Sequence, residues 1–435
     1  MLTPVDFLEE VIRAQKRREV RGIASVCSAH PFVLKTAIRR AARAGDCVLV
    51  ESTCNQVNQY GGYTGMTPAG FAGYLRGLTR EEGLPADRLL LGGDHLGPSV
   101  WQGRPAAAAM EEAETLVRQC VEAGYVKVHL DTSMRLADDN PSQPLDVEIS
   151  ARRAATLARA AEGAHAARPE SPAPRYVIGT EVPLPGGSVG RTNQVEVTSV
   201  ADVRQTINAS REAFDAEGLQ AAWERVVAVV VQPGVEFGDG FVLTYDPQAS
   251  DALSTFIASE PHLVYEAHST DYQQPAALEA LVRDHFAVLK VGPALTFAFR
   301  EGVFALAMIE DELLTGSRMS ERSRIIEVLD AAMCRVPQHW AGHYRGTPEE
   351  VARARKYSLS DRSRYYWNDE GVRRALEQMI GNLKARQIPM TLLSQFLPVQ
   401  YARIREEAID SAPQALLMDR IGQVLEGYAA ACGRT

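Results

Sequence analysis

Eight short apolar segments alternate with amphipathic segments along most of this chain, and this alternation limits its possible folds more than any other feature. Apolar runs without a polar face are typical of parallel strands that helices cover on both sides. Eight such units predict an α/β protein with a (β/α)8 TIM barrel. An open, doubly wound sheet is the alternative, but no GxGxxG motif follows the first predicted strand. The predicted strands are Gly22–Ser28, Asp46–Thr53, Leu89–His95, Val126–Asp131, Arg175–Glu181, Val226–Gly234, His262–Ser269 and Phe286–Pro293.

The chain is longer than a barrel alone requires, since such a barrel takes about 250 residues and the chain has 435. We predict an N-terminal amphipathic helix over residues 1–20 and the barrel over residues 21–315. The sequence of residues 316–435 has mostly helical patterning, which predicts a helical appendage packed on the barrel.

Composition excludes several classes of function. The formal net charge of −9 argues against a nucleic-acid partner. No apolar run is long enough to span a bilayer, and the N-terminus lacks a signal-peptide core, so we expect no membrane association and a cytoplasmic location. The six cysteines form no CxxC pair, which favours free thiols over a disulfide framework or a thiolate zinc site.

The segment LLLGGDHLGP, residues 89–98, carries the first candidate for chemistry. Its leucines predict a buried strand, Gly92 and Gly93 predict a tight turn, and Asp94 and His95 follow at the strand end. A carboxylate beside an imidazole can place one group on a metal and the other on a substrate proton. The alternative is that Asp94 caps the next helix and His95 forms a hydrogen-bonded pocket wall.

Other predicted strands end in the same kinds of side chain. Charged residues are rarely buried unless they are paired or bind a ligand, and active sites of TIM barrels lie at the C-terminal ends of the strands. These residues therefore predict one shared site. In strand order they are Cys27, Ser28 and His30; Glu51 and Asn55; Asp94 and His95; His129 and Asp131; Glu181; Gln232; Glu266, His268 and Asp271; and Lys290.

Some of these residues suit a divalent metal. His95 and His268 with Glu181 would form a nitrogen and oxygen ligand set for Zn²⁺ foremost, or for Mn²⁺ or Co²⁺. Gln232 is either a neutral metal ligand or a binder of a substrate hydroxyl. His129 is interpreted as a buried histidine tied to a neighbouring carboxylate.

Lys290 allows two interpretations. A desolvated lysine could form a Schiff base with a carbonyl substrate. An ion pair with one of the neighbouring carboxylates is the preferred interpretation, because so many carboxylates are predicted to lie nearby.

Further residues predict a site for a phosphorylated polyol. The loop NQVNQYGGYTGMTP supplies Asn55 and Gln56 for hydroxyl groups, Tyr63 for a sugar face and glycines for hinge motion. In SDRSRYYW, Arg362 and Arg364 are candidates for binding a phosphate. The N-terminus of the helix after the eighth strand, in GPALT, is the other natural phosphate site.

Motifs over essentially the whole chain resemble those of the GatZ/KbaZ family. They are SVCSAHP, ESTCNQVNQYGGYTGMTP, LGGDHLGP, HLDTSM, VIGTEVPLPGG, VVQPGVEF, EAHSTDYQ, LKVGPALTFA and SDRSRYYW. Members of this family are described as the non-catalytic subunit of class II tagatose-bisphosphate aldolase, and some relatives act alone as tagatose 6-phosphate 4-epimerases. Others have been labelled tagatose-6-phosphate kinases, but this chain has no phosphate-binding GxxxxGK[ST] loop and no kinase motif set.

The resemblance extends to class II aldolases, which are metal-dependent barrels. It implies that Asp94 is the proton-transfer carboxylate, that His95 is a zinc ligand and that His268 is a later ligand. Where those aldolases have a further ligand histidine, this chain has Gln232, with Glu181 available to complete the set. This departure argues against simple aldolase activity but not against metal binding.

The reaction that fits best is metal-dependent C4 epimerisation of a ketohexose 6-phosphate, D-tagatose 6-phosphate to D-fructose 6-phosphate, by retro-aldol cleavage and re-formation of the C3–C4 bond. We expect Asp94 to handle the C4 hydroxyl proton and Asp131 or Glu181 to act on the other side. The alternative is a non-catalytic subunit that stabilises a separate class II tagatose-bisphosphate aldolase. We also expect a homo-oligomer. The predicted substrate-binding residues are Ser28, Glu51, Asn55, Gln56, Tyr63, Lys290, Arg362 and Arg364.

Overall fold

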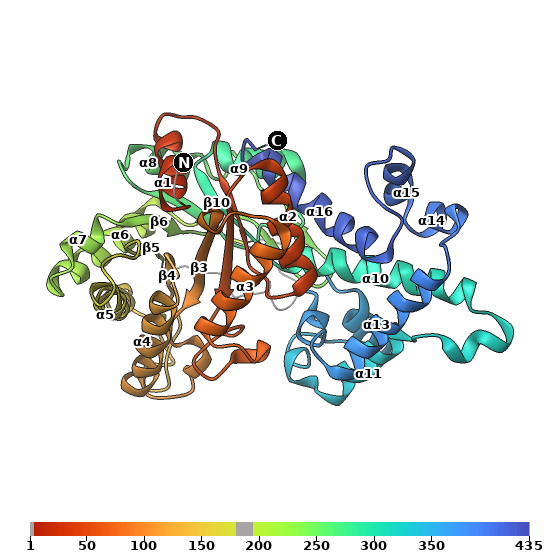
Figure 1. The fold of residues 1–435 in the computed structure, drawn as a ribbon. Helices are drawn as coiled ribbons and strands as arrows, with labels where there is room; N and C mark the ends of the chain where they lie inside the picture. The colour runs from red at the N-terminus through yellow and green to blue at the C-terminus, as the bar shows by residue number, and fades with distance from the viewer. Residues whose placement is uncertain (1–3, 180–194, 435) are drawn as a thin grey trace.

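A closed barrel of eight parallel strands forms the centre of the computed structural model, which describes residues 4–179 and 195–434 (Figure 1). The predicted TIM barrel is therefore confirmed, with each strand within its predicted segment or one residue beyond it. Around the barrel the strand order is β1-β10-β9-β6-β5-β4-β3-β2. The strands are β1 (Ile23–Val26), β2 (Val48–Thr53), β3 (Leu89–Leu96), β4 (Lys127–Leu130), β5 (Arg175–Ile178), β6 (Val226–Val230), β9 (Val264–Ala267) and β10 (Phe286–Val291).

A small antiparallel ribbon outside the barrel was not predicted. It consists of β7 (Glu236–Phe237) and β8 (Val242–Leu243), which pair with each other in the loop after β6. Its two-residue strands are too short to give an alternating pattern in the sequence. Phe237 from this ribbon reaches the mouth of the barrel.

The helices begin and end at residues whose backbone chemistry favours a terminus. In α3, Thr67 accepts the N–H of Gly70, Pro68 occupies the first turn, and Gly83 closes the helix at φ +73°. The helices are α1 (Pro4–Lys16), α2 (Pro31–Ala44), α3 (Pro68–Glu82), α4 (Ala106–Glu122), α5 (Val147–Ala166), α6 (Val200–Ala216), α7 (Gln220–Trp223), α8 (Asp251–Ser259), α9 (Pro275–Arg283), α10 (Pro293–Leu313), α11 (Ile325–Arg335), α12 (Pro348–Tyr357), α13 (Glu370–Ala385), α14 (Met390–Phe396), α15 (Pro398–Arg405) and α16 (Pro413–Ala431).

The barrel interior is apolar at the end where the strands begin. Helix α1 closes this end, and Leu8 on it is fully buried against the strands. The apolar layer comprises Val5, Leu8, Val11, Ile12, Ile23, Leu49, Leu90, Val126, Val177, Val227, Ala228, Val230, Val264, Ala287 and Val288. Two residues further along several strands, where side chains again point inward, this layer gives way to ionisable side chains.

The C-terminal helix α16 lies against the barrel, although the chain between α10 and α16 leads away from it (Figure 1). It packs against α2, α9 and α10 and contacts β1. The backbone N–H of Gly22, just before β1, donates to the carbonyl of Cys432 at 3.2 Å. Helices α11 to α15 form a separate layer beside α10 that reaches the mouth of the barrel through residues 362–365. Among the described residues, no helix is both long and apolar enough to cross a membrane.

Candidate functional site

The C-terminal ends of the barrel strands surround a cavity of about 650 Å³. Its walls also include Arg364 and Tyr365, which come from the short 3-10 helix Arg362–Tyr365 outside the barrel. Ring contact between Tyr63 and Tyr365, at 4.8 Å between centroids, joins the loop after β2 to this helix. The predicted site residues that line the cavity are Cys27, Asn55, Gln56, Tyr63, Asp94, His95, His268, Asp271, Lys290 and Arg364.

The Asp94–His95 pair lies within strand β3 and not after a turn. The predicted tight turn at Gly92 and Gly93 is wrong, because both residues belong to the strand and neither has a positive φ. A Cβ on Gly92 would lie 2.7 Å from Cγ of Glu51, so the glycine provides space inside the barrel. The left-handed residue is His95, with φ +48°, a conformation that non-glycine residues adopt rarely and often at functional sites.

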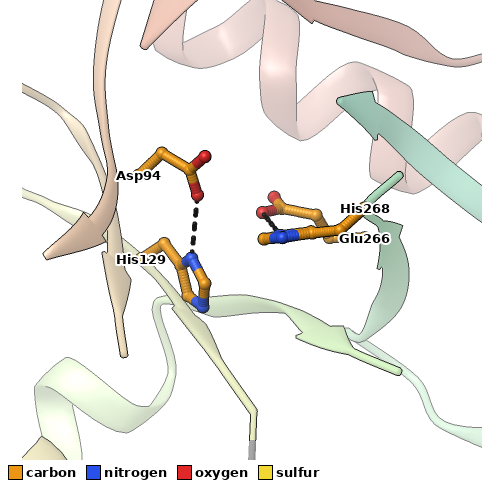
Figure 2. Close-up of side chains that lie close together, drawn as sticks. All are labelled: Asp94, His129, Glu266 and His268. Atoms are coloured by element: carbon orange, nitrogen blue, oxygen red, sulfur yellow. Dashed lines mark hydrogen bonds and ion pairs between the residues drawn. The ribbon is translucent and has the colours of Figure 1, made fainter. Parts of the chain in front are cut away.

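Three imidazole rings meet at the base of the cavity. The ring centroid of His95 lies 5.2 Å from that of His129 and 4.9 Å from that of His268, and His129 and His268 are 5.2 Å apart. They come from β3, β4 and the end of β9, so the closure of the barrel brings them together. Figure 2 shows two of these rings with Asp94 and Glu266.

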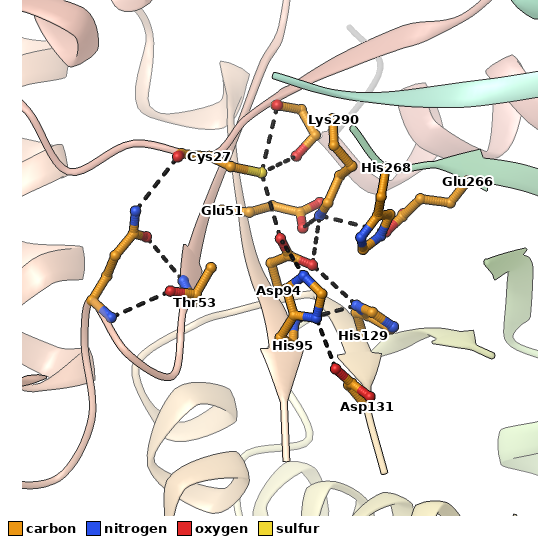
Figure 3. Close-up of polar contacts among 12 residues, drawn as sticks. Cys27, Glu51, Thr53, Asp94, His95, His129, Asp131, Glu266, His268 and Lys290 are labelled. Atoms are coloured by element: carbon orange, nitrogen blue, oxygen red, sulfur yellow. Dashed lines mark hydrogen bonds and ion pairs between the residues drawn. The ribbon is translucent and has the colours of Figure 1, made fainter. Parts of the chain in front are cut away.

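Asp94 connects this cluster to the rest of the mouth. Its Oδ1 lies 3.0 Å from His129 Nδ1 and accepts from Lys290 Nζ at 3.0 Å, and its Oδ2 lies 3.7 Å from His95 Nε2 (Figure 3). Burial alone would raise the pKa of Asp94, but His95, Lys290 and His129 together hold it well below its usual range. Asp94 is therefore an ionised carboxylate in the cavity wall.

Asp131 acts through His95. Its Oδ2 accepts from His95 Nδ1 at 2.7 Å, and its Oδ1 accepts from the backbone N–H and the hydroxyl of Ser133. With both oxygens engaged, Asp131 orients the His95 imidazole, and it is not among the described residues that line the cavity. A histidine that donates one N–H to a carboxylate keeps its other nitrogen free to bind a metal, here Nε2.

Three ionisable side chains, those of Glu51, Lys127 and Glu266, fill the barrel directly below the cavity floor and contact Lys290 or each other. Lys127 Nζ lies 2.6 Å from both Glu51 Oε1 and Glu266 Oε2, and all three side chains are fully buried. Lys290 Nζ contacts the other oxygen of Glu51 and lies 3.4 Å from Glu266 Oε1. Burial would raise the pKa of Glu266, but Lys127 and Lys290 hold it well below its usual range.

The same network decides between the two interpretations of Lys290. Burial lowers its pKa, but Asp94, Cys27, Glu266 and Glu51 outweigh burial and raise it well above the usual range. A lysine ammonium that stays protonated cannot attack a carbonyl, so the ion pair is confirmed and the geometry disfavours a Schiff base.

The donor set fits a divalent metal ion. Asp94, His129, Glu266 and His268 each offer a ligand atom, and these atoms lie within 4.8 Å of one another. The His129 Nε2 atom is buried and has no hydrogen-bond partner among the described residues. Burial lowers the pKa of His268 to about 4, so its imidazole is neutral and keeps a lone pair. Imidazole and carboxylate ligands together suit Zn²⁺, Mn²⁺ or Co²⁺.

Other predicted site residues lie away from this group. Gln232 is not among the described residues that line the cavity, because its Oε1 accepts the N–H of Gly234 at 2.8 Å. Glu51 lies below the floor, held by the two lysines. Arg362 is buried behind the wall, with Nη2 2.9 Å from His343 Nδ1. Ser28 lines an adjoining hollow, and Glu181 lies outside the described residues.

The predicted phosphate site at the N-terminus of α10 is wrong. Asp271 Oδ1 accepts the N–H groups of Gly292 at 3.0 Å and of Ala294 at 2.8 Å, and the next two amides bond to the Gly292 carbonyl. A carboxylate of this chain therefore already occupies the place of an anion. Burial raises the pKa of Asp271 to about 6.

Comparison with known proteins identifies the family. Residues 8–433 match the model of a family described as D-tagatose-1,6-bisphosphate aldolase subunit GatZ/KbaZ-like. This chain belongs to the GatZ/KbaZ-like family. The resemblance expected from the motifs is thus confirmed over nearly the whole sequence.

Individual members of the GatZ/KbaZ-like family align over almost their full length. The chain is 49% identical over 426 residues to the D-tagatose-1,6-bisphosphate aldolase subunit GatZ of Salmonella heidelberg (strain SL476), covering 98% of this chain and 99% of that protein. It is 48% identical over 425 residues to the subunit of the same name from Salmonella typhimurium, with the same coverage. A crystal structure described as a probable tagatose 6 phosphate kinase from Sinorhizobium meliloti is 43% identical, covers 95% of this chain and 100% of that chain, and has a TM-score of 0.86.

Sequence reasoning missed one residue of the site in this GatZ/KbaZ-like chain, because Lys127 was not singled out. His129 was placed among the strand-end residues but was interpreted as the partner of a carboxylate, which it is, and not as a metal ligand. In VKVHLD, residues 127, 129 and 131 share one face of a strand, so the alternation that grouped His129 with Asp131 also pointed to Lys127. The third dimension was needed to show that Lys127 crosses the barrel to Glu51 and Glu266.

Proposed function

We propose that this chain serves as a GatZ-type subunit of a tagatose-bisphosphate aldolase, paired with a separate aldolase polypeptide. The observation that carries the proposal is its 49% identity, over 98% of its length, to a protein of that name. The matching regions include both the barrel and the helices beyond it, so surfaces on either part are available to a partner.

The test is to co-express the chain with a class II tagatose-bisphosphate aldolase polypeptide. We expect the two to elute together in size-exclusion chromatography with light scattering, and the aldolase activity to decay several times more slowly than without the chain. The control is an equal concentration of an unrelated TIM-barrel protein. Separate elution together with an unchanged half-life would contradict the proposal.

A second function is favoured by a specific observation, the buried ring of imidazoles and carboxylates at the mouth. A subunit that only stabilises a partner has no need for a buried His129 Nε2 that lacks a partner among the described residues, or for a cavity at this end of the barrel. The corresponding activity is metal-dependent C4 epimerisation of a ketohexose 6-phosphate, D-tagatose 6-phosphate to D-fructose 6-phosphate.

In this reaction His129 and His268 would hold a divalent metal together with Asp94 or Glu266. His95, whose ring lies beside both of these imidazoles, would be a further donor. Such an ion supplies a Lewis acid that polarises the ketose carbonyl. Asp131 fixes the ring orientation of His95 through the 2.7 Å hydrogen bond. The Lys127–Glu266 contact in turn fixes the carboxylate beside His268.

Asp94 is the residue suited to move the proton of the C4 hydroxyl, because it is an ionised carboxylate that lines the cavity. As the proton leaves, the C4–O bond becomes an aldehyde carbonyl and the electron pair of the C3–C4 bond stays on C3. After the aldehyde turns its other face, C3 attacks it, and a proton returns to the C4 oxygen. The configuration at C4 is then inverted, and substrate and product contain the same atoms. Glu181 remains the predicted second proton carrier.

The epimerase proposal is tested on the purified chain alone. We expect tagatose 6-phosphate to yield fructose 6-phosphate after addition of Zn²⁺, Mn²⁺ or Co²⁺, and the conversion to stop with EDTA. ¹³C NMR of the two sugar phosphates measures the conversion directly. Absence of fructose 6-phosphate with all three metals would contradict this function and leave the subunit role unaffected.

A further inference from the structure

The cavity is lined by two cations that differ in their surroundings. Lys290 contacts three carboxylates, those of Glu51, Asp94 and Glu266, so its charge is already balanced within the protein. Arg364 makes no ion pair within the part of the chain that the structure describes: the carboxylate of Asp361 is paired with Arg300 at 3.1 Å, and Asp271 and Asp361 attract Arg364 only at longer range. A half-buried charge without a direct ion-pair partner is costly, so this guanidinium is set up to receive an anion from outside the chain.

The contacts of Arg364 hold its guanidinium in place but do not use all of its N–H donors. Its Nη1 donates to the backbone carbonyls of Ser360 and Asp361, and its Nη2 donates to the hydroxyl of Tyr365 at 3.0 Å. The guanidinium carbon also lies 4.5 Å from the centroid of the Tyr365 ring. A guanidinium has five N–H donors, so donors remain for a ligand in the cavity.

A second hollow adjoins the first and shares Arg364 as part of its wall. Trp367 lines it with only 3% of its surface exposed, and its Nε1 has no acceptor among the described residues. Ser28 and His30 are among the other polar residues of this wall, and burial lowers the pKa of His30 to about 3, which keeps its imidazole neutral. The described lining of the hollow therefore offers a fixed cation, an unsatisfied N–H donor and no ionised acid.

We propose that Arg364 and Trp367 form the binding site for the single phosphate group of a ketose, at the end of the cavity away from the histidine cluster. This inference rests on the proposal that the mouth takes a phosphorylated ketohexose, and it adds which residues hold the phosphate. The phosphate is the missing counter-ion of Arg364 and the acceptor for Trp367 Nε1–H. Both residues lie outside the barrel strands. The segment after the barrel therefore supplies the phosphate specificity of a site at the mouth of the barrel.

The charge distribution also limits the ligand to one phosphate. At the histidine end of the cavity, the described lining residues include the carboxylate of Asp94, and Lys290 there is already neutralised. A second phosphate on the carbonyl side of the ketose would face this carboxylate. The preferred ligand class is therefore a ketose with one terminal phosphate remote from its carbonyl. The second phosphate of a 1,6-bisphosphate should not increase binding affinity.

The experiment measures binding by isothermal titration calorimetry on the purified full-length chain, without an aldolase partner and under conditions without turnover. The ligands are tagatose 6-phosphate, tagatose 1,6-bisphosphate, unphosphorylated tagatose and inorganic phosphate. We expect the 6-phosphate to bind at least about tenfold more tightly than tagatose, which is the value of one charge-assisted contact. We expect the bisphosphate to bind no more tightly than the 6-phosphate. Inorganic phosphate alone separates simple anion binding from recognition of the sugar.

Variants assign the effect to residues. Arg364→Gln should weaken 6-phosphate binding by about tenfold or more and leave the weak binding of tagatose unchanged. Trp367→Phe, which removes the Nε1–H and keeps most of the ring packing, should weaken it by several fold. Arg374→Gln on α13 removes an exposed arginine paired with Glu370 and is the control.

Several outcomes would overturn the inference. These are unchanged 6-phosphate affinity in both Arg364→Gln and Trp367→Phe, bisphosphate binding tenfold tighter than 6-phosphate binding, or no binding of the 6-phosphate by the wild-type chain. If Arg364→Gln does not fold, Arg364→Lys and Trp367→Phe provide the same comparison. Because binding is measured without partner or turnover, Arg364-dependent binding in a chain that neither epimerises nor stabilises an aldolase would uphold this site and contradict only the proposed function.

Discussion

The two ends of the barrel interior are built from the same strands but have opposite chemistry. Where the strands begin, inward-facing residues such as Leu49, Leu90 and Val288 pack against α1. Two to four residues further along the same strands, the inward positions hold Glu51, Asp94 and Lys290. The first end stabilises the fold by burying apolar surface. The second buries charges that are costly unless paired, which is expected of a site kept for function.

This comparison predicts that the ionic end is the more fragile to a single substitution. Replacing Lys127 with Met should lower the free energy of unfolding by about 3–5 kcal/mol, because Glu51 and Glu266 then lose one of the two buried lysines that neutralise them. Urea unfolding followed by circular dichroism measures the loss. The matched control is Lys35→Met, which removes the exposed pair with Glu81 and should change stability by less than about 1 kcal/mol. Equal effects of the two substitutions would refute the distinction.

The apolar end should respond in stability alone. Leu8→Ala removes a fully buried side chain from α1 and should cost about 3 kcal/mol, while metal content and ligand affinity stay as in the wild-type chain. Val399→Ala, at a position that is 51% exposed, serves as the control. A loss of bound metal in Leu8→Ala would mean that the two ends are coupled and would break the comparison.

The metal cluster at the ionic end should respond in metal affinity. His95→Ala and His268→Ala should each weaken metal binding by about tenfold or more, since each removes an imidazole from the three-ring cluster. Equilibrium dialysis against Zn²⁺ followed by elemental analysis measures the bound metal. His262→Ala, an exposed histidine at the opposite end of β9, is the control. Full metal content in both cluster variants would show that the ligand set is wrong.

The smallest expected effect is a pH dependence located at the mouth. Burial lowers the pKa of His30 from 6.5 to about 3, so the unfolded chain binds a proton more readily than the folded one. The stability that neutral His30 provides is complete above pH 6.5 and is lost as the pH falls toward 3. Between pH 7 and pH 5, wild-type unfolding free energy should therefore drop by about 1–2 kcal/mol more than that of His30→Phe. Identical slopes in urea titrations at the two pH values would contradict this assignment.

Much of the barrel and part of its site could be predicted from the sequence. Each predicted strand contains one of the barrel strands to within one residue, because a buried parallel strand needs a continuous apolar run that is visible in the chain itself. Asp94, His95, His268 and Lys290 follow from the rule that polar residues at strand ends meet at one edge of a barrel. The prediction of a turn at Gly92 was wrong. The sequence alone does not distinguish a glycine that leaves space for the Glu51 side chain from a glycine that allows a tight turn.

Only the tertiary structure decided which side chains touch. The sequence contains Lys127 and His129 two residues apart, but the closure of the barrel determines that one crosses to Glu51 and Glu266 and the other meets Asp94. It likewise contains Arg362 and Arg364 in one short motif, and the fold turns Arg364 into the cavity while Arg362 bonds to His343 behind it. Local pattern determines strands and helices because their hydrogen bonds and buried faces are periodic, whereas pairing between distant residues depends on how those elements close around one another.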